Sequence, residues 1–178
     1  YFIIMNFLKA SLVITLSLFG FGLPFNPIGL NNDEELFVIE RNRDANTVHY
    51  EVNLEANGHL SLKNPIEVFW IKSEQNNQKE SLTWVQRKYG YGIKIKENNK
   101  DYVNFVLVCQ KDKLLTLKKG KDQEFRVFVK LQNEEVILEK ITINFDEGGS
   151  FMIPKVNHIV IHGYKETDGT KVEELIEG

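Results

Sequence analysis

The clearest strand pattern in this chain is Thr47-Val48-His49-Tyr50-Glu51-Val52-Asn53-Leu54, in which polar and apolar side chains alternate. Successive side chains of a β-strand point to opposite faces of its sheet. The larger apolar side chains of this stretch therefore share one face, and the polar ones share the other. Such alternation predicts a strand with one face in a core and the other in solvent, which is typical of antiparallel sheets.

Short runs of the same kind lie on both sides of this strand, separated by turn residues. They are rich in Val, Ile, Phe, Tyr and Thr, which favour strands. The predicted strands are residues 36–41, 47–54, 66–72, 93–96, 102–109, 114–118, 125–131, 136–145 and 157–164. Asn57-Gly58 is a turn signal, and residues 129–136 are typical of a tight hairpin. The sequence thus predicts an all-β fold, either a single antiparallel β-sandwich or a small β-barrel of about nine strands.

One segment, near residues 81–89, departs from the strand pattern. Ser81 can cap the start of a helix, and Gly90 can end it. Leu82, Val85 and Tyr89 would share one face of that helix. We therefore predict one short helix of one to two turns. A strand is the alternative, because the β-branched and aromatic residues at positions 83–85 favour it.

The chain divides into four parts. The N-terminal part has a start with one positive charge, then a continuous apolar run, then small residues, and this order is typical of a secretory signal peptide. The predicted parts are a signal peptide at 1–22, a linker at 23–35, the β-domain at 36–166 and a flexible C-terminal tail at 167–178.

The N-terminal segment also predicts where the protein works. Only fourteen residues separate Lys9 from Pro24, fewer than the ~20 that a membrane-spanning helix needs. We expect a cleaved signal and no stable membrane span, with an uncleaved anchor as the alternative. No Cys follows the apolar run, so no lipid anchor is expected. The expected location is therefore periplasmic or secreted.

Charge and cysteine content exclude several classes of function. The formal net charge is −3 and there is no block of basic residues, which argues against a nucleic-acid partner. Cys109 is the only cysteine, so no internal disulfide can form. Because it ends the apolar run Val106-Leu107-Val108-Cys109, we expect its thiol to be buried and unreactive.

Two patterns resemble metal sites only in part. Residues 53–60 follow the start of a calcium loop, but Asn64 stands where the bidentate Glu is needed, and a polar hairpin loop is the preferred interpretation. His158 and His162 lie on a predicted strand, where positions four apart are separated by about 13 Å, too far for one metal ion to join. We expect no metal and no cofactor. The sequence also carries none of the spacings typical of a catalytic serine or a phosphate loop.

The densest functional pattern is Trp84-Val85-Gln86-Arg87-Lys88-Tyr89-Gly90-Tyr91-Gly92. Aromatic residues and Arg are the residue types that binding sites favour. Trp70, on a preceding strand, could join this group. The candidate ligand-binding residues are therefore Trp70, Trp84, Arg87, Tyr89 and Tyr91, and the four aromatic rings are expected to line an interior cavity. The preferred interpretation is structural: the helix is a packing plug at the end of the barrel, with Trp84, Val85 and Tyr89 in the core and Arg87 and Lys88 in solvent.

Four segments together resemble a known family. They are, in order, Leu36-Phe37-Val38-Ile39-Glu40-Arg41, Ala45-Asn46-Thr47-Val48-His49-Tyr50, Pro65-Ile66-Glu67-Val68-Phe69-Trp70-Ile71 and Arg87-Lys88-Tyr89-Gly90-Tyr91-Gly92. This order resembles the domain of unknown function DUF4833 over about residues 36–165. The resemblance implies an exported bacterial protein and carries no activity and no catalytic residues.

Two functions follow from these observations. The first is a non-catalytic binding module for a small apolar or amphipathic molecule or for a cell-envelope partner. The second is a periplasmic enzyme acting on an envelope substrate, with His49, Glu51 and Arg87 as polar catalytic groups converging in one cleft. Binding is favoured, because enzymes usually leave a recognisable spacing of catalytic residues.

Overall fold

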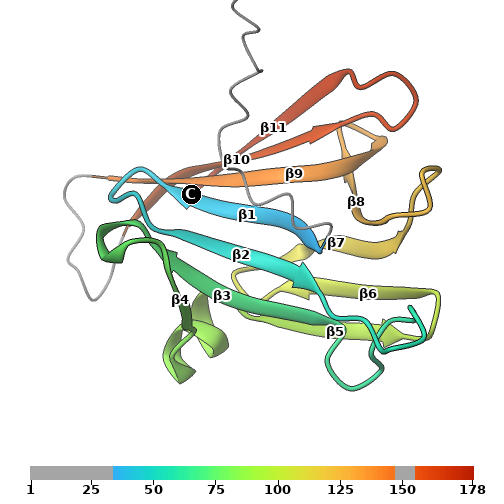
Figure 1. The fold of residues 1–178 in the computed structure, drawn as a ribbon. Helices are drawn as coiled ribbons and strands as arrows, with labels where there is room; N and C mark the ends of the chain where they lie inside the picture. Colours follow the sequence, from blue (N-terminus) through green and yellow to red (C-terminus); the bar gives the residue numbers. More distant parts are fainter. Residues whose placement is uncertain (1–33, 147–154) are drawn as a thin grey trace, which may run out of the picture. The chain divides into compact units, whose positions relative to one another are not determined.

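The structure is a computed structural model that describes residues 34–146 and 155–178 (Figure 1). Its described part is built almost entirely of strands, which confirms the all-β fold. The strands are β1 (Glu35–Arg41), β2 (Thr47–Val52), β3 (Ile66–Lys72), β4 (Gln78–Ser81), β5 (Ile93–Asn98), β6 (Tyr102–Leu107), β7 (Gln110–Lys119), β8 (Phe125–Leu131), β9 (Glu134–Phe145), β10 (Val156–Tyr164) and β11 (Lys171–Glu177). Two short helical turns, η1 (Ser73–Gln75) and η2 (Gln86–Gly90), lie beside β4.

Nine of the strands form one curled sheet, in the order β4-β3-β2-β1-β9-β8-β7-β6-β5, and β10 and β11 branch from β9. The branch arises because β9 is long. Along one edge its first half pairs with β8 and its second half with β1, while β10 takes the other edge. The sheet therefore curls into a half-barrel (Figure 1). Every pairing is antiparallel except that of β1 with β9, which is parallel.

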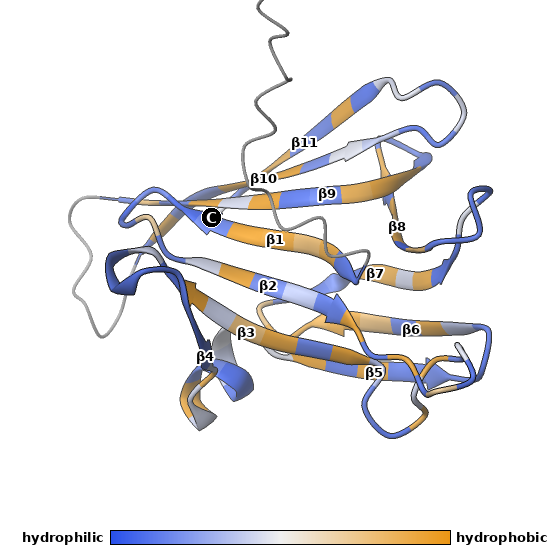
Figure 2. Cartoon of the chain, in the orientation of Figure 1, coloured by the Kyte–Doolittle hydropathy of each residue, from blue (hydrophilic) through white to orange (hydrophobic). Residues whose placement is uncertain are grey.

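The inner face of the curled sheet carries one hydrophobic core. The alternation of β2 is as predicted, since Val48, Tyr50 and Val52 are buried in it. The ring of Tyr50 stacks on Phe37 with a centroid distance of 4.2 Å. Apolar and polar colours alternate along most strands in Figure 2, as expected for a sheet with one buried face. Each fully buried large side chain contributes roughly 1.5–3 kcal/mol to folding.

The prediction of a flexible tail at 167–178 is wrong, because β11 lies there and pairs with β10 along its whole length. Its Val172 and Ile176 pack against the core, and Glu174 forms an ion pair with Lys113. The sequence conceals this strand because most of its residues are charged. The same reason hides β4, whose four residues are all polar and exposed.

The predicted short helix exists but begins three residues later than expected. Ser81 ends β4, and helical backbone runs from Trp84 to Gly90. Thr83 caps it, because its Oγ1 accepts a hydrogen bond from the Gln86 amide at 3.3 Å while Gln86 Oε1 accepts one from the Thr83 amide at 2.9 Å. This reciprocal pair is a capping box. The spacing Thr-x-x-Gln is a sequence signal that places the helix start correctly.

Candidate functional site

The most conspicuous surface feature is the helical segment 83–90, which we call the aromatic turn. In Figure 1 it projects from the end of β4, away from the rest of the sheet. Trp84, Val85 and Tyr89 are 66%, 57% and 63% exposed. The packing-plug interpretation, which placed these three side chains in the core, is therefore wrong. The helix face predicted to be buried against the barrel instead faces solvent.

The side chains of the aromatic turn form a compact group. The rings of Trp84 and Tyr89 meet edge to face, with centroids 6.1 Å apart and an interplanar angle of 88°. The ammonium group of Lys88 lies 4.7 Å from the Trp84 ring centroid and 5.0 Å from that of Tyr89. Each such exposed cation–π contact contributes about 0.5–1 kcal/mol. Two aromatic rings and a cation are thereby presented together on one small surface.

Tyr91 anchors the C-terminal end of the aromatic turn to the body of the domain. Its ring meets the buried ring of Trp70 edge to face, at a centroid distance of 5.1 Å. The guanidinium of Arg41 lies 4.4 Å from the Trp70 ring and donates a hydrogen bond of 3.2 Å to the Tyr91 hydroxyl. Asp44 holds that guanidinium with two hydrogen bonds of 2.6 and 2.8 Å. Burial raises the pKa of Tyr91 and outweighs the opposing effect of Arg41, so the phenol stays protonated.

A close backbone approach follows the turn at Gly92. A Cβ atom at this position would lie 1.9 Å from the carbonyl oxygen of Arg87, so a side chain cannot be accommodated there. Gly92 therefore lets the chain leave the aromatic turn and enter β5. The exit of the turn is shaped by this contact and by the packing of Tyr91.

The structure separates the five predicted site residues into two groups. Trp70 is 2% exposed and lies in the core, with Tyr91 half-buried against it. Trp84, Arg87 and Tyr89 lie exposed on the aromatic turn. An interior cavity lined by all four aromatic rings is therefore not formed. Trp70 and Tyr91 form a buried contact at the base of the segment, and Trp84, Arg87 and Tyr89 form its exposed surface.

The residues of the enzymatic alternative lie elsewhere. His49 is on the outer face of β2, where Nδ1 lies 2.5 Å from Glu35 Oε2 and Nε2 lies 2.8 Å from Thr47 Oγ1. Glu51 is on the same face and forms an ion pair of 3.3 Å with Lys79. Arg87 is exposed on the aromatic turn.

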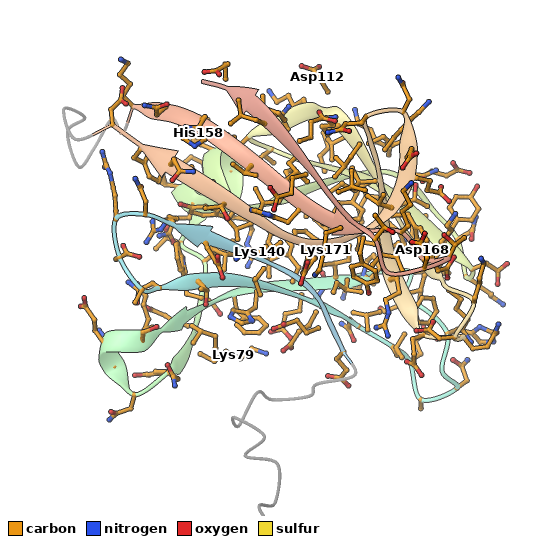
Figure 3. The ribbon with its side chains drawn as sticks, turned by 90° about the horizontal axis from the view of Figure 1, so that it is seen from above. Lys79, Asp112, Lys140, His158, Asp168 and Lys171 are labelled. Atoms are coloured by element: carbon orange, nitrogen blue, oxygen red, sulfur yellow. The ribbon has the colours of Figure 1, made fainter. Side chains whose placement is uncertain are left out.

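Sequence reasoning missed a second network like that of His49. His162 on β10 lies 3.1 Å from Thr142 Oγ1 and 2.8 Å from Glu173 Oε1. Both histidines belong to the charged outer face of the sheet, where Lys140 pairs with Glu40 at 2.8 Å. Figure 3 looks onto this part of the molecule and labels Lys140, His158 and Lys171. These networks join residues from different strands, so only the pairing of the strands brings them together.

The structure corrects the prediction for Cys109. The residue lies in the turn between β6 and β7 and is exposed, whereas the apolar run before it had predicted a buried strand. The atoms around its sulfur still remove water from the thiol, and this desolvation raises its pKa above the ordinary value of 9.0. The thiol is thus accessible but protonated at neutral pH.

One hollow lies on the surface formed by β6 and β7. It is an open depression of about 550 Å³, lined by residues that include His59, Tyr102, Thr116 and Lys118. None of the candidate site residues lines this hollow. Within residues 34–146 and 155–178, no group of three or more His, Cys, Asp and Glu side chains could hold a metal ion. No helix in the same ranges has the length and apolarity to cross a bilayer.

Comparisons with other proteins agree with the family resemblance of the four segments. The model of the domain of unknown function DUF4833 matches residues 37–175, from β1 into β11. Comparison with curated proteins and with solved structures gave no match. Because the family model covers most of the chain, this protein belongs to the DUF4833 family.

Proposed function

We propose that this chain is an exported, non-catalytic binding domain whose aromatic turn docks on an amphipathic, acidic component of the cell envelope. The observation that carries the proposal is the exposure of Trp84, Val85 and Tyr89 on one projecting turn. Large apolar side chains gathered on a surface commonly mark a binding site. Trp and Tyr in particular favour the boundary between water and an apolar phase, since each has an apolar body and a polar tip.

The charges of the turn support an acidic partner. Arg87 and Lys88 lie between the aromatic residues, while the chain as a whole has a net charge of −3. General attraction to an acidic surface is therefore not expected, and any attraction must come from this local group. In this proposal the apolar part of the partner packs on Trp84, Val85 and Tyr89, and its acidic groups pair with the two cations.

The rigidity of the turn also supports binding. The capping box of Thr83 and Gln86 holds its start, and Tyr91 holds its end against Trp70 and Arg41. A preorganised surface loses less conformational entropy when it binds. Burial of one large apolar side chain contributes roughly 1.5–3 kcal/mol, so the turn can supply useful affinity from a few contacts.

The proposed location rests on the sequence of residues 1–22, which lies outside the described residues. In the proposal this segment directs export, and the domain works in the periplasm or outside the cell without a lipid anchor. Cell fractionation tests this part separately. Recovery of the protein with its N-terminal segment intact in the cytoplasm would contradict it, whatever the result of the binding experiments.

The binding proposal is tested by co-sedimentation of the purified protein with lipid vesicles. One set contains phosphatidylglycerol and is acidic, and the other contains only phosphatidylcholine. We expect binding to the acidic vesicles, at least tenfold weaker in Trp84→Ala, which corresponds to about 1.4 kcal/mol. Leu114→Ala is the matched control, because Leu114 is 53% exposed on another part of the surface.

Two results would overturn the proposal. One is equal binding by the wild type and Trp84→Ala. The other is absence of binding to the acidic vesicles together with absence of binding to purified cell-wall polymer. A reduced affinity in Lys88→Glu, with normal affinity in Leu114→Ala, would identify the cation–acid pairing as part of the interaction.

One observation favours the enzymatic alternative. The contacts of His49 with Thr47 and Glu35 place an imidazole between a hydroxyl and a carboxylate, as in activation of a nucleophile by an oriented base. In that case Thr47→Ala and His49→Gln would both abolish hydrolysis of an envelope substrate and leave vesicle binding unchanged. Under the binding proposal neither substitution affects the interaction of the aromatic turn.

A further inference from the structure

The described part of the sheet ends in three edge strands, β4, β5 and β11. An open edge presents unpaired backbone groups that can bind another strand, and proteins usually protect such edges. β4 has four residues and is too short to offer much pairing. β5 is interrupted by a bulge between Ile95 and Glu97, and it carries Lys94 and Lys96. Both edges therefore have the features that prevent edge-to-edge association.

β11 also carries charged side chains, Lys171, Glu173, Glu174 and Glu177, but it has neither the shortness of β4 nor the bulge of β5. It pairs with β10 over seven consecutive residues without a shift of register, and it contains neither Pro nor Gly. Leu175 is 56% exposed on it. A straight, regular edge with an exposed apolar side chain is a suitable surface for adding a further strand.

Hydrogen bonds at its two ends show which backbone groups of β11 are directed outward. The Gly178 amide donates to the Asn157 carbonyl at 2.8 Å, and the Lys165 amide donates to the Thr170 carbonyl at 2.9 Å. In an antiparallel ladder such pairs recur at every second residue. The residues at 172, 174 and 176 therefore bond to β10. The amide and carbonyl groups of Lys171, Glu173, Leu175 and Glu177 point toward the open edge.

Few described groups occupy that edge. Gln132 Nε2 donates a hydrogen bond of 2.8 Å to the Glu173 carbonyl. A carbonyl oxygen has two lone pairs and can accept a second hydrogen bond. An incoming strand therefore shares or displaces this exposed side-chain bond at Glu173, which within residues 34–146 and 155–178 is the one hydrogen bond to the outward groups of β11.

We propose that β11 pairs antiparallel with the β11 of a second copy of this chain, about a twofold axis at Glu174. In this register Lys171 lies opposite the partner's Glu177, so an opposite-charge pair forms at each end. Glu173 lies opposite the partner's Leu175, and the outward backbone groups of these residues form the new ladder. On the other face Val172 lies opposite the partner's Ile176, which adds an apolar pair.

Charge selects this register over its neighbours. Only residues with outward backbone groups can bond to one another across the new ladder. The register can therefore shift only in steps that again place outward residues opposite outward residues. One alternative places Glu173 opposite the partner's Glu173, and the other places Glu173 opposite the partner's Glu177. Both put like charges directly across the ladder, which is destabilising. The proposed register also brings two like charges together, the Glu174 side chains, but each is neutralised by its own Lys113. Of the three registers it alone gains the two pairs of Lys171 with Glu177.

The dimer would change how the aromatic turn acts. Each copy carries one aromatic turn, so the dimer carries two. Two linked weak sites can bind far more tightly than either alone. The inference itself does not depend on the proposed binding function, because it rests only on the edge of β11.

Sedimentation equilibrium of the purified protein across a wide concentration range tests the dimer. We expect a reversible monomer–dimer equilibrium in the wild type. In Leu175→Pro the outward amide is lost while the ladder to β10 remains, and Pro is tolerated at an open edge. This variant should be monomeric over the same range, with a circular dichroism spectrum like that of the wild type.

A charge exchange tests the register without relying on Pro. Lys171→Glu and Glu177→Lys should each weaken the dimer at least tenfold, and the double variant should restore it. Lys94→Glu on the β5 edge is the control and should dimerise normally. A wild type that is monomeric at millimolar concentration would overturn the proposal. A dimer that survives Leu175→Pro, or a double variant that fails to restore dimerisation, would overturn it equally.

Discussion

The hydroxyl of Tyr50 on β2 donates a hydrogen bond of 2.6 Å to the backbone carbonyl of Tyr91, just before β5. β2 and β5 lie near opposite ends of the strand order, and no ladder joins them. This hydrogen bond, with the contacts of Arg41 and Trp70 to the Tyr91 side chain, connects the two ends of the half-barrel. Burial raises the pKa of Tyr50 well above its ordinary value, so the hydroxyl remains a donor.

We expect Tyr50→Phe to lower the free energy of unfolding by about 1–3 kcal/mol, because the Tyr91 carbonyl would lose its partner in a half-buried site. The stacking on Phe37 would be kept, since the ring is unchanged. Urea unfolding followed by circular dichroism measures the difference. Tyr164→Phe on β10 is the matched control and should have little effect. Equal losses in the two variants would show that the hydrogen bond to Tyr91 has no special role.

Fluorescence should separate the two tryptophans, because Trp70 is 2% exposed and Trp84 is 66% exposed. We expect Trp84→Phe to leave a blue-shifted emission that acrylamide quenches weakly. Trp70→Phe should leave a red-shifted emission that acrylamide quenches strongly. Acidic vesicles should then protect only Trp84 from quenching. Protection of Trp70 alone would place the partner away from the aromatic turn.

The strands that the sequence predicted well are those with one buried face. β3 and β8 have the predicted limits, because both are rich in apolar residues along their length and each begins at a buried apolar side chain. β4 and β11 could not be found in this way, since both are edge strands of mainly polar residues. Each pairs with the strand directly before it in the chain, β4 with β3 and β11 with β10, but their polar residues give no sign of a strand. The ion pair of Glu174 with Lys113, which also holds β11, joins residues far apart in the sequence.

The candidate site shows a different limit of sequence reasoning. The pattern of segment 84–92 predicted the residue types of a binding surface and a short helix, but not the direction in which its apolar face would point. An apolar helix face is normally buried. The exposure of Trp84 is decided by the geometry of the turn between β4 and β5, including the close approach of Gly92 to Arg87. Periodicity carries no information about such a contact.

Cys109 should react in the folded protein, because it is exposed. Its desolvation raises the thiol pKa above 9.0, so only a small fraction is thiolate at neutral pH. We expect labelling by a thiol-disulfide reagent to be complete but slower than for free cysteine, with a rate that increases up to and beyond pH 9. Stopped-flow measurements from pH 7 to 10 test this. A rate that is independent of pH, or labelling only after unfolding, would contradict it.

The last prediction concerns Glu174, which holds β11 against the rest of the domain. Burial alone would raise the pKa of this carboxyl group. The ion pair with Lys113 and a hydrogen bond of 3.1 Å from the Gln132 amide have the opposite effect and lower it below the ordinary value of 4.5. A carboxyl group with a lowered folded-state pKa adds stability above its unfolded-state pKa, and this stability is lost as the pH falls through the folded-state value.

At pH values below about 4.5 we therefore expect the free energy of unfolding of the wild type to decrease, in part because Glu174 becomes protonated. Glu174→Gln keeps the shape of the side chain but cannot titrate. The variant should be less stable than the wild type at pH 7, and the difference should shrink as the pH decreases toward 3. Urea unfolding at several pH values measures both curves, with Glu74→Gln at an exposed position of η1 as the control. Parallel curves for the wild type and Glu174→Gln would show that the ionised carboxylate does not stabilise the attachment of β11.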